Sequence, residues 1–184
     1  MEYLIHSGGS GGADMVWENT GLEYGIKTVA YSFYNHAHES QFPKILSPDE
    51  LSEGWGACKV ATKTLKRPLN RIMYPYIKNL ISRNWFQVKN SEATFAIGTF
   101  VNDQKKLVNG GTGWAVQMSI DNNHPVYFYD QKNENWNIYS EQYKKFLQLY
   151  ELPAIPKNFA GIGTRQINQA GIEAIEDLFK HCFK

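Results

Sequence analysis

Short apolar runs alternate along this chain with segments in which apolar residues recur at helical spacing. The runs are typical of short buried strands. They predict strands at residues 2–6, 27–32, 93–97, 126–129 and 158–162. The helical spacing predicts helices at residues 13–24, 69–83, 113–122 and 166–182. Strand, helix and strand within the first 32 residues is the βαβ pattern, which implies a parallel pair of strands.

Two stretches show no clear period. Residues 33–68 mix Tyr, His, Ser, Pro and Gly. That is long for a loop, so we expect short helices or a lid there. Residues 130–152 are polar and aromatic, and we expect a hairpin or a small helix around residues 139–150. Pro75 is expected to kink the helix at 69–83 or to mark its real start.

Alternating strands and helices place the chain in the α/β class, with a Rossmann-like, doubly wound and mostly parallel sheet. At 184 residues, we expect a single domain over residues 1–184. Its expected units are a βαβ unit with a glycine turn at 1–32, a lid or insert with a helix at 33–92, a strand, turn, helix and strand at 93–130, a connector at 131–157, and a strand and helix at 158–184.

Composition narrows the function classes. The formal net charge is +1, so there is no basic surplus of the kind that a dedicated DNA-binding surface needs. The two cysteines, Cys58 and Cys182, match no metal-binding spacing and favour a reducing compartment. We find no charged leader before an apolar segment and no run of membrane-spanning length. The sequence therefore predicts a cytoplasmic protein without a membrane partner.

Three glycine-bearing turns follow apolar runs and precede helical patterns. They are residues 7–14 (SGGSGGAD), 109–113 (NGGTG) and 161–165 (GIGTR). A strand that turns through glycines into a helix presents backbone N–H groups and the positive helix end to one point, which suits a phosphate. A side chain at Gly9 or Gly111 is expected to block that approach. The three turns together favour a nucleotide or a nucleotide-like ligand.

Four segments resemble motifs of the SLOG superfamily. Residues 6–14 (HSGGSGGAD) are similar to its SGGAxGAD segment, and residues 83–88 (RNWFQV) to the RN-aromatic-QV segment of its phage and bacterial DNA-processing-like branch. Residues 110–116 (GGTGWAV) resemble its GGTG-x-A segment, and residues 159–165 (FAGIGTR) its FAGIGSR strand and turn. The superfamily groups DNA-processing protein A-like proteins, Lonely Guy phosphoribohydrolases and nucleotide-sensor domains of bacterial defence systems.

The order of these motifs is circularly permuted relative to most of that superfamily, because the FAGIGTR unit comes last. The resemblance then implies that the last helix leads back to the first strand, with Cys182 close to residue 1. Right-handed crossovers give a sheet order of 27–32, 2–6, 158–162, 93–97 and 126–129. All three glycine turns would then lie at the carboxyl ends of neighbouring strands, where such sheets bind ligands.

The resemblance implies a binding site with a defined set of residues. They are Ser7, Gly8, Gly9, Ser10, Gly12, Ala13, Asp14, Arg83, Asn84, Gly110, Gly111, Thr112, Gly113, Gly161, Gly163, Thr164 and Arg165. A guanidinium fork suits phosphate, so Arg83 and Arg165 are expected to face the anion, although Arg83 could instead cap its helix. We expect a nucleotide or nucleotide-derived ligand, an immune signalling nucleotide included, that is bound without turnover.

A nucleotide N-glycosidic-bond hydrolase is the alternative. Lonely Guy enzymes carry PGGxGTxxE, in which the glutamate assists cleavage, and the resembled segment puts Gln117 at that glutamate. Glutamine cannot act as a general base or stabilise an oxocarbenium-like centre by charge. Asp14 is a candidate replacement, although a carboxylate in the first turn of a helix also serves the helix N-terminus. We therefore expect no catalytic residue.

A DNA-processing-like, single-stranded DNA-binding protein is a further alternative. Its only candidate surface is the basic cluster of Lys59, Lys63, Lys66, Arg67 and Arg71, a run that equally suits a solvated face. We accordingly expect no nucleic-acid partner.

The remaining expectations concern metal, assembly and origin. The spacing of His36 and His38 could hold a metal only with a third ligand, and a polar loop explains it as well, so neither metal nor cofactor is expected. The resemblance implies bacterial or phage origin and self-association as a homodimer or homotetramer. In a phage, it would suit a protein that sequesters a host signalling nucleotide.

Overall fold

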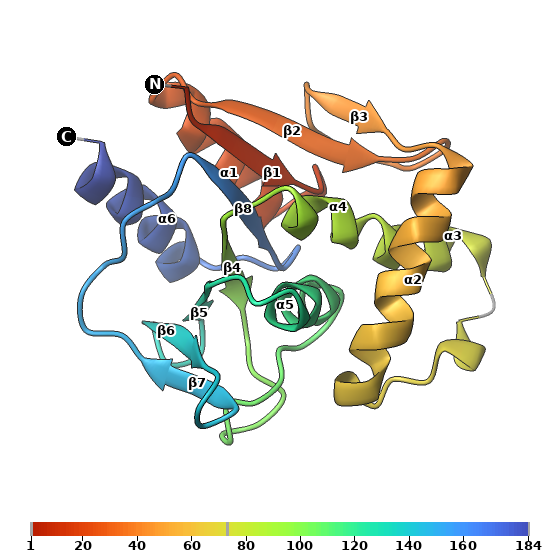
Figure 1. The fold of residues 1–184 in the computed structure, drawn as a ribbon. Coiled ribbons are helices and arrows are strands. Elements are labelled where there is room, and N and C mark those ends of the chain that lie inside the picture. Colours follow the sequence, from red (N-terminus) through yellow and green to blue (C-terminus); the bar gives the residue numbers. More distant parts are fainter. Residues whose placement is uncertain (1, 73, 184) are drawn as a thin grey trace.

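The computed structural model describes residues 2–72 and 74–183 and has an α/β architecture. One eight-stranded sheet runs in the order β3-β2-β1-β8-β4-β5-β6-β7 (Figure 1). The strands are β1 (Leu4–Ser7), β2 (Lys27–Ser32), β3 (Pro43–Ile45), β4 (Ala93–Gly98), β5 (Val126–Asp130), β6 (Asn135–Ser140), β7 (Lys145–Gln148) and β8 (Asn158–Gly163). The helices are α1 (Ala13–Glu23), α2 (Pro48–Leu65), α3 (Pro75–Ser82), α4 (Asn84–Lys89), α5 (Thr112–Asp121) and α6 (Gln169–Cys182), with a short 3₁₀ turn at Leu69–Arg71.

The expected order of the five central strands is confirmed. Although β8 is the last strand in the chain, it lies between β1 and β4 and is parallel to both. Strands β2 and β5 flank this trio, also in parallel pairings. The two ends of the chain lie on the same side of the molecule (Figure 1), and near them the rings of Tyr3 and Phe183 stand edge to face with centroids 4.9 Å apart. The last strand of the chain therefore lies at the centre of the sheet.

Helices cover both faces of the sheet, as a doubly wound fold requires. All six residues of β4 are buried, and its side chains alternate between the two faces. Phe95 and Ile97 join the core beneath α1 and α6, together with Trp17 and Phe159. Ala96 belongs to the core on the opposite face, which lies beneath α2, α4 and α5.

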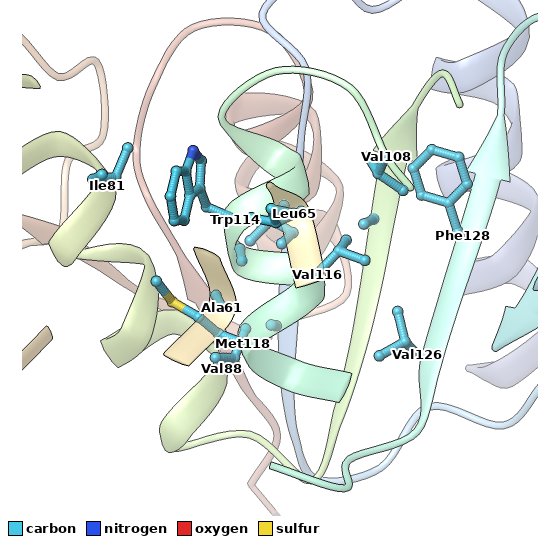
Figure 2. Packing of buried hydrophobic residues seen from close by; sticks show 14 of the residues in the cluster. Ala61, Leu65, Ile81, Val88, Val108, Trp114, Val116, Met118, Val126 and Phe128 are labelled. Carbon is cyan, nitrogen blue, oxygen red and sulfur yellow. The ribbon is translucent and has the colours of Figure 1, made fainter. Parts of the chain in front are cut away.

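Helix α5 is the centre of the second core. In Figure 2, Trp114 and Met118 point from α5 toward the neighbouring helices, whereas Val116 points toward the sheet, where β5 carries Val126 and Phe128. All five side chains are at least nine-tenths buried. Burial of this kind stabilises by about 1.5–3 kcal/mol for each large apolar side chain. Packing on two sides therefore fixes where α5 begins, and that start forms part of the site described below.

The segment at 33–68 is more regular than its sequence indicates. It holds the edge strand β3 and the 18-residue helix α2. Helix α2 begins with a capping box in which Ser47 and Glu50 each accept a hydrogen bond from the other's backbone N–H, followed by Pro48 at the first helical position. These residues can be recognised in the sequence, and together they predict the start of a helix. Leu51, Trp55, Cys58, Ala61 and Leu65 also recur at helical spacing, although two glycines and several polar residues lie between them.

Other boundaries differ from expectation for local reasons. The helix expected at 69–83 is interrupted, and Pro75 marks the real start of α3, which is one of the two alternatives considered. Helix α6 begins at Gln169, three residues later than expected, because the side chain of Asn168 caps it by accepting a 2.9 Å hydrogen bond from the N–H of Gly171. A hairpin, β6 and β7, occupies the expected region after β5.

Candidate functional site

A cavity of about 500 Å³ opens at the carboxyl ends of the central strands, between the starts of α1 and α5. It lies where β8 and β4 end and where the helices change from one face of the sheet to the other, which is the usual ligand position in such folds. Its lining comprises Ser10, Asp14, Leu80, Ile81, Arg83, Asn84, Gln87, Gly98, Thr99, Asn109, Gly110, Gly111, Thr112, Ala115, Ile162, Gly163, Thr164, Arg165 and Gln166. The cavity therefore brings together parts of all three glycine turns.

The second turn exposes backbone N–H groups at the start of α5. Within the described residues, the N–H groups of Gly110, Gly111 and Thr112 donate no hydrogen bond, and α5 has no side-chain cap. Gly110 has a φ of 65°, which favours glycine, whereas Gly111 has helical backbone angles. A Cβ on Gly111 would meet no atom within 4 Å, so the backbone here is open to a ligand.

An arginine from the helix opposite holds the second turn in place. Arg67, just after α2, donates hydrogen bonds to the carbonyl oxygens of Gly110 (2.7 Å) and Val108 (2.8 Å). The carbonyl groups of the turn are thereby bound, while its N–H groups remain free. This role was not anticipated, because in the sequence Arg67 is one member of a basic cluster.

In the third turn, Gly161 and Gly163 allow close packing, whereas Arg165 faces the cavity. A Cβ on Gly161 would lie 2.8 Å from Trp17, and the N–H groups of Gly163 and Thr164 donate to Asp14 and to the Ile97 carbonyl. Arg165 lines the cavity from the following position. Its side chain is exposed and makes no hydrogen bond or ion pair within residues 2–72 and 74–183. This guanidinium is available to an anion.

The first turn is mostly covered by the protein itself. A Cβ on Gly9, where φ is 63°, would lie 2.9 Å from the Cβ of Ser40, and the Gly9 carbonyl accepts a 2.8 Å hydrogen bond from the N–H of Glu39. A Cβ on Gly12 would lie 2.5 Å from the backbone of Arg165. Glycines of this turn thus allow segments of the protein to pack closely. From the turn, only Ser10 and Asp14 line the cavity.

The expected site residues accordingly separate into two sets. Those that line the cavity are Ser10, Asp14, Arg83, Asn84, Gly110, Gly111, Thr112, Gly163, Thr164 and Arg165. Those that pack behind it are Ser7, Gly8, Gly9, Gly12, Ala13, Gly113 and Gly161. The residues of the second set lie where chain segments cross closely, and close crossing requires small residues as strictly as ligand approach does.

Arg83 is largely committed to the fold. Its guanidinium is buried and donates to the carbonyl oxygens of Gly8 and Tyr31 (2.9 Å for Tyr31) and to the hydroxyl of Ser10 (2.9 Å). Its Nε has no partner among the described residues. Burial lowers the pKa of Arg83 from its usual value, and the neighbouring Asp14 counteracts that effect. Arg83 therefore orders the first turn beside the cavity rather than capping its own helix.

Asp14 connects the first and third turns. One carboxylate oxygen accepts from the N–H of Gly163 (3.1 Å) and the other from the N–H of Ser10 (3.2 Å). Burial raises the pKa of Asp14 from 3.8 to about 6, although Arg83 and the backbone donors favour the charged form. Among the described residues, it is the only carboxylate that lines the cavity.

Helix α4 contributes a residue that the sequence analysis missed. Gln87 lines the cavity one helical turn after Asn84, and its Nε2 donates to the Asn84 side-chain oxygen at 3.4 Å. Asn84 in turn donates to the carbonyl oxygen of Gly111 at 3.3 Å. The i, i+3 spacing of these two amides within the RNWFQV segment was the available signal. The cavity also has an apolar wall that includes Leu80, Ile81 and Ala115.

Gln117 lies away from this cavity. Its side-chain amide donates a 2.8 Å hydrogen bond to Asp121, one turn later on α5, and it does not line the cavity. The helix surface that faces the cavity carries Thr112 and Ala115 instead. Position 117 therefore lies on a different face of α5 from the residues that line the cavity.

The expected alternatives for metal and nucleic acid gain no geometric support. The rings of His36 and His38 lie 6.2 Å apart, and the described residues contain no group of three or more His, Cys, Asp or Glu that could hold a metal. In the basic cluster, Arg67 is engaged with the second turn, and the side chain of Arg71 lies outside the described part of the structure.

Over the described ranges, every helix is too short or too polar to cross a membrane. The resemblance to the SLOG superfamily remains a prediction from its motifs, because no protein-family model, curated protein or solved structure matches this chain.

Proposed function

We propose that this protein binds a phosphorylated small molecule of the nucleotide class, with a phosphate at the start of α5. One observation carries the proposal. The free N–H groups of Gly110, Gly111 and Thr112 line a cavity of about 500 Å³ that the unpaired guanidinium of Arg165 also lines. A volume of this size suits a ligand as large as a mononucleotide.

The electrostatics of the cavity favour an anion at this end. The start of a helix carries partial positive charge, and successive free N–H groups add donors that a phosphate oxygen accepts. Arg165 adds a full positive charge and a planar fork of donors. The remaining charges, on Asp14 and Arg83, lie close to one another and offset each other. The unbalanced positive charge of the cavity is therefore that of Arg165 and the helix.

We propose binding without turnover because of the position of Asp14, the one carboxylate among the described residues that lines the cavity. Hydrolysis of an N-glycosidic bond needs a carboxylate that can reach the anomeric centre or a water molecule. Backbone hydrogen bonds to both oxygens hold Asp14 between the first and third turns, so we assign it to holding a ligand rather than to activating water, and Gln117 is directed to Asp121. Asp14 is thereby assigned to positioning and binding.

The proposal is tested by identifying what the protein holds. Mass spectrometry of small molecules released by heat from the purified protein should find a phosphorylated compound. Isothermal titration calorimetry with nucleoside monophosphates and diphosphates, cyclic dinucleotides and ADP-ribose should show binding, and liquid chromatography should recover each compound intact. Absence of binding across this panel would refute the function, and release of free base would refute binding without turnover.

A matched pair of variants locates the site. Gly111→Val places a side chain beside the free N–H groups, and its Cβ would meet no atom within 4 Å, so affinity should fall at least about tenfold while the protein stays folded. Gly56→Val is the control, because Gly56 is exposed on α2 and a Cβ there also meets nothing within 4 Å. Equal loss in both variants would place the anion elsewhere.

A further inference from the structure

The inner part of the cavity is built from buried polar side chains that the phosphate end does not use. Ser10, Asp14, Asn84 and Gln87 line it, with exposed fractions of 8%, 5%, 7% and 3%. Three polar groups converge at Gly8, where an added Cβ would lie 2.6 Å from Gln87 Nε2 and 2.7 Å from Asp14 Oδ2 and would also meet the Arg83 guanidinium. Gln87 and Asp14 are therefore close enough to contact one ligand group together.

These side chains retain unused hydrogen-bonding capacity. The Asp14 carboxylate accepts backbone hydrogen bonds from Ser10 and Gly163, and Gly8 is a further backbone donor to it, which leaves part of its about four acceptor positions unused. The side-chain oxygen of Gln87 accepts nothing within the described residues, and its amide makes only the long contact to Asn84. Both residues line the cavity while their side chains are at least nine-tenths buried, so a ligand in the cavity can use these remaining positions.

The chemistry of this region suits neutral hydroxyl groups. Asp14 and Gln87 offer acceptors, Gln87 and the Ser10 hydroxyl offer donors, and Arg83 compensates the charge of Asp14. A second phosphate would meet the Asp14 carboxylate and be repelled. A pair of sugar hydroxyls can donate to a carboxylate and exchange hydrogen bonds with an amide, as acidic residues do with ribose in dinucleotide-binding folds.

The position of the region identifies which part of a nucleotide it meets. Asn84 contacts the carbonyl of Gly111 in the phosphate-binding turn and contacts Gln87 on its other side. The polar region therefore begins directly beside the phosphate end. In a nucleoside 5′-phosphate, the group attached to the phosphate is the sugar.

We infer that Asp14 and Gln87 bind the vicinal hydroxyls of a ribose, so that the site selects ribonucleotides over 2′-deoxyribonucleotides. The inference rests on the proposed function, since it assumes a phosphate at Gly110–Thr112. It adds a substrate class and two specificity-determining residues. Gln87 is the more informative of the two, because its side chain makes a single long hydrogen bond among the residues that the structure describes.

The experiment compares matched ligands on the wild-type protein. Isothermal titration calorimetry is run with ribose 5-phosphate and 2-deoxyribose 5-phosphate, and with ribonucleoside 5′-monophosphates and 5′-diphosphates and their 2′-deoxy counterparts. Each ribose compound should bind at least about tenfold more tightly than its deoxy partner, because the deoxy sugar leaves a buried acceptor unpaired. Equal affinities overturn the ribose inference and leave the proposed function standing, whereas no binding by any compound overturns both.

A variant pair assigns the selectivity to Gln87. Gln87→Met keeps the length of the side chain but removes its polar atoms, and the ribose-to-deoxyribose affinity ratio should fall by about three- to tenfold. Gln142→Met makes the same change at an exposed position outside the cavity, in the turn between β6 and β7, and should leave the ratio unaltered. A ratio that persists in Gln87→Met, in protein shown by circular dichroism to be folded, overturns the assignment.

Discussion

Arg67 Nη1 donates a 2.7 Å hydrogen bond to the carbonyl oxygen of Gly110, across 43 residues of sequence. A second bond, from Nη2 to the buried carbonyl of Val108, completes a two-pronged contact. Helix α2, which belongs to the segment that looked irregular in sequence, thus supports the turn in which we place the phosphate. The residue that follows α2 therefore fixes the backbone of the turn at the start of α5.

We expect Arg67→Met to loosen the turn at Gly110, because the change removes both hydrogen bonds. The change leaves the Val108 carbonyl buried without its partner, which should lower the free energy of unfolding by about 1–3 kcal/mol and weaken nucleotide binding. Lys63→Met, one turn earlier on an exposed face of α2, is the control and should alter neither quantity. Urea denaturation and calorimetry measure the two effects. Unchanged affinity in Arg67→Met would show that the turn holds its shape without the arginine.

Gly9 and Gly111 should respond oppositely to the same substitution. Gly9→Ala forces a Cβ to within 2.9 Å of Ser40 and 3.0 Å of Ala30 at a φ of 63°, so it should cost about 1–3 kcal/mol of stability. Gly111→Ala meets no atom within 4 Å at helical angles and should leave stability unchanged or slightly raised. Thermal unfolding of the two variants is the measurement. Similar losses in both would contradict the distinction drawn between the turns.

Asp14 should make stability depend on pH in an unusual direction. Its pKa is raised from 3.8 to about 6, so between these values the native state holds a proton that the unfolded state has lost. The stability that Asp14 contributes is therefore full below pH 3.8 and is lost as pH rises to about 6, a change of about 3 kcal/mol. Relative to Asp14→Asn, the wild type should lose stability over that window. A constant difference between the two proteins from pH 4 to 7 would contradict the raised pKa.

Two buried histidines should act in the opposite sense. Burial lowers the pKa of both His6 and His36 from 6.5 to about 4. The unfolded state then takes up protons first, so the stability that each contributes is present above pH 6.5 and is lost as pH falls toward 4. Replacing His36 with Asn should reduce acid destabilisation in this window, as urea titrations at several pH values would detect. Equal acid sensitivity in the variant would assign the effect to other groups.

The topology could be predicted from the sequence. Which glycines allow close packing and which leave the backbone open to the cavity could not. Apolar runs mark the strands, and the handedness of crossovers restricts their order, so the central place of β8 followed from rules. Gly161 and Gly111 look alike in sequence, yet a Cβ on Gly161 would lie 2.8 Å from Trp17, 144 positions earlier, whereas a Cβ on Gly111 would meet no atom within 4 Å. That difference depends on long-range packing. Gln87 and the Ser47–Glu50 capping box, in contrast, carried local signals that could have been used.

The central position of β8 has a consequence for how the chain acquires its structure. During synthesis, β1 to β3 and β4 to β7 emerge before the strand that joins them, because β8 alone pairs with both β1 and β4. Until it arrives, the facing edges of β1 and β4 are unpaired and the apolar surfaces around Phe95 and Trp17 lack Phe159. Folding of the whole sheet requires these late contacts. They form slowly because they join residues that are far apart in sequence. The nascent protein therefore passes through a stage with two open strand edges, and in that stage it depends most on rapid completion or on chaperones.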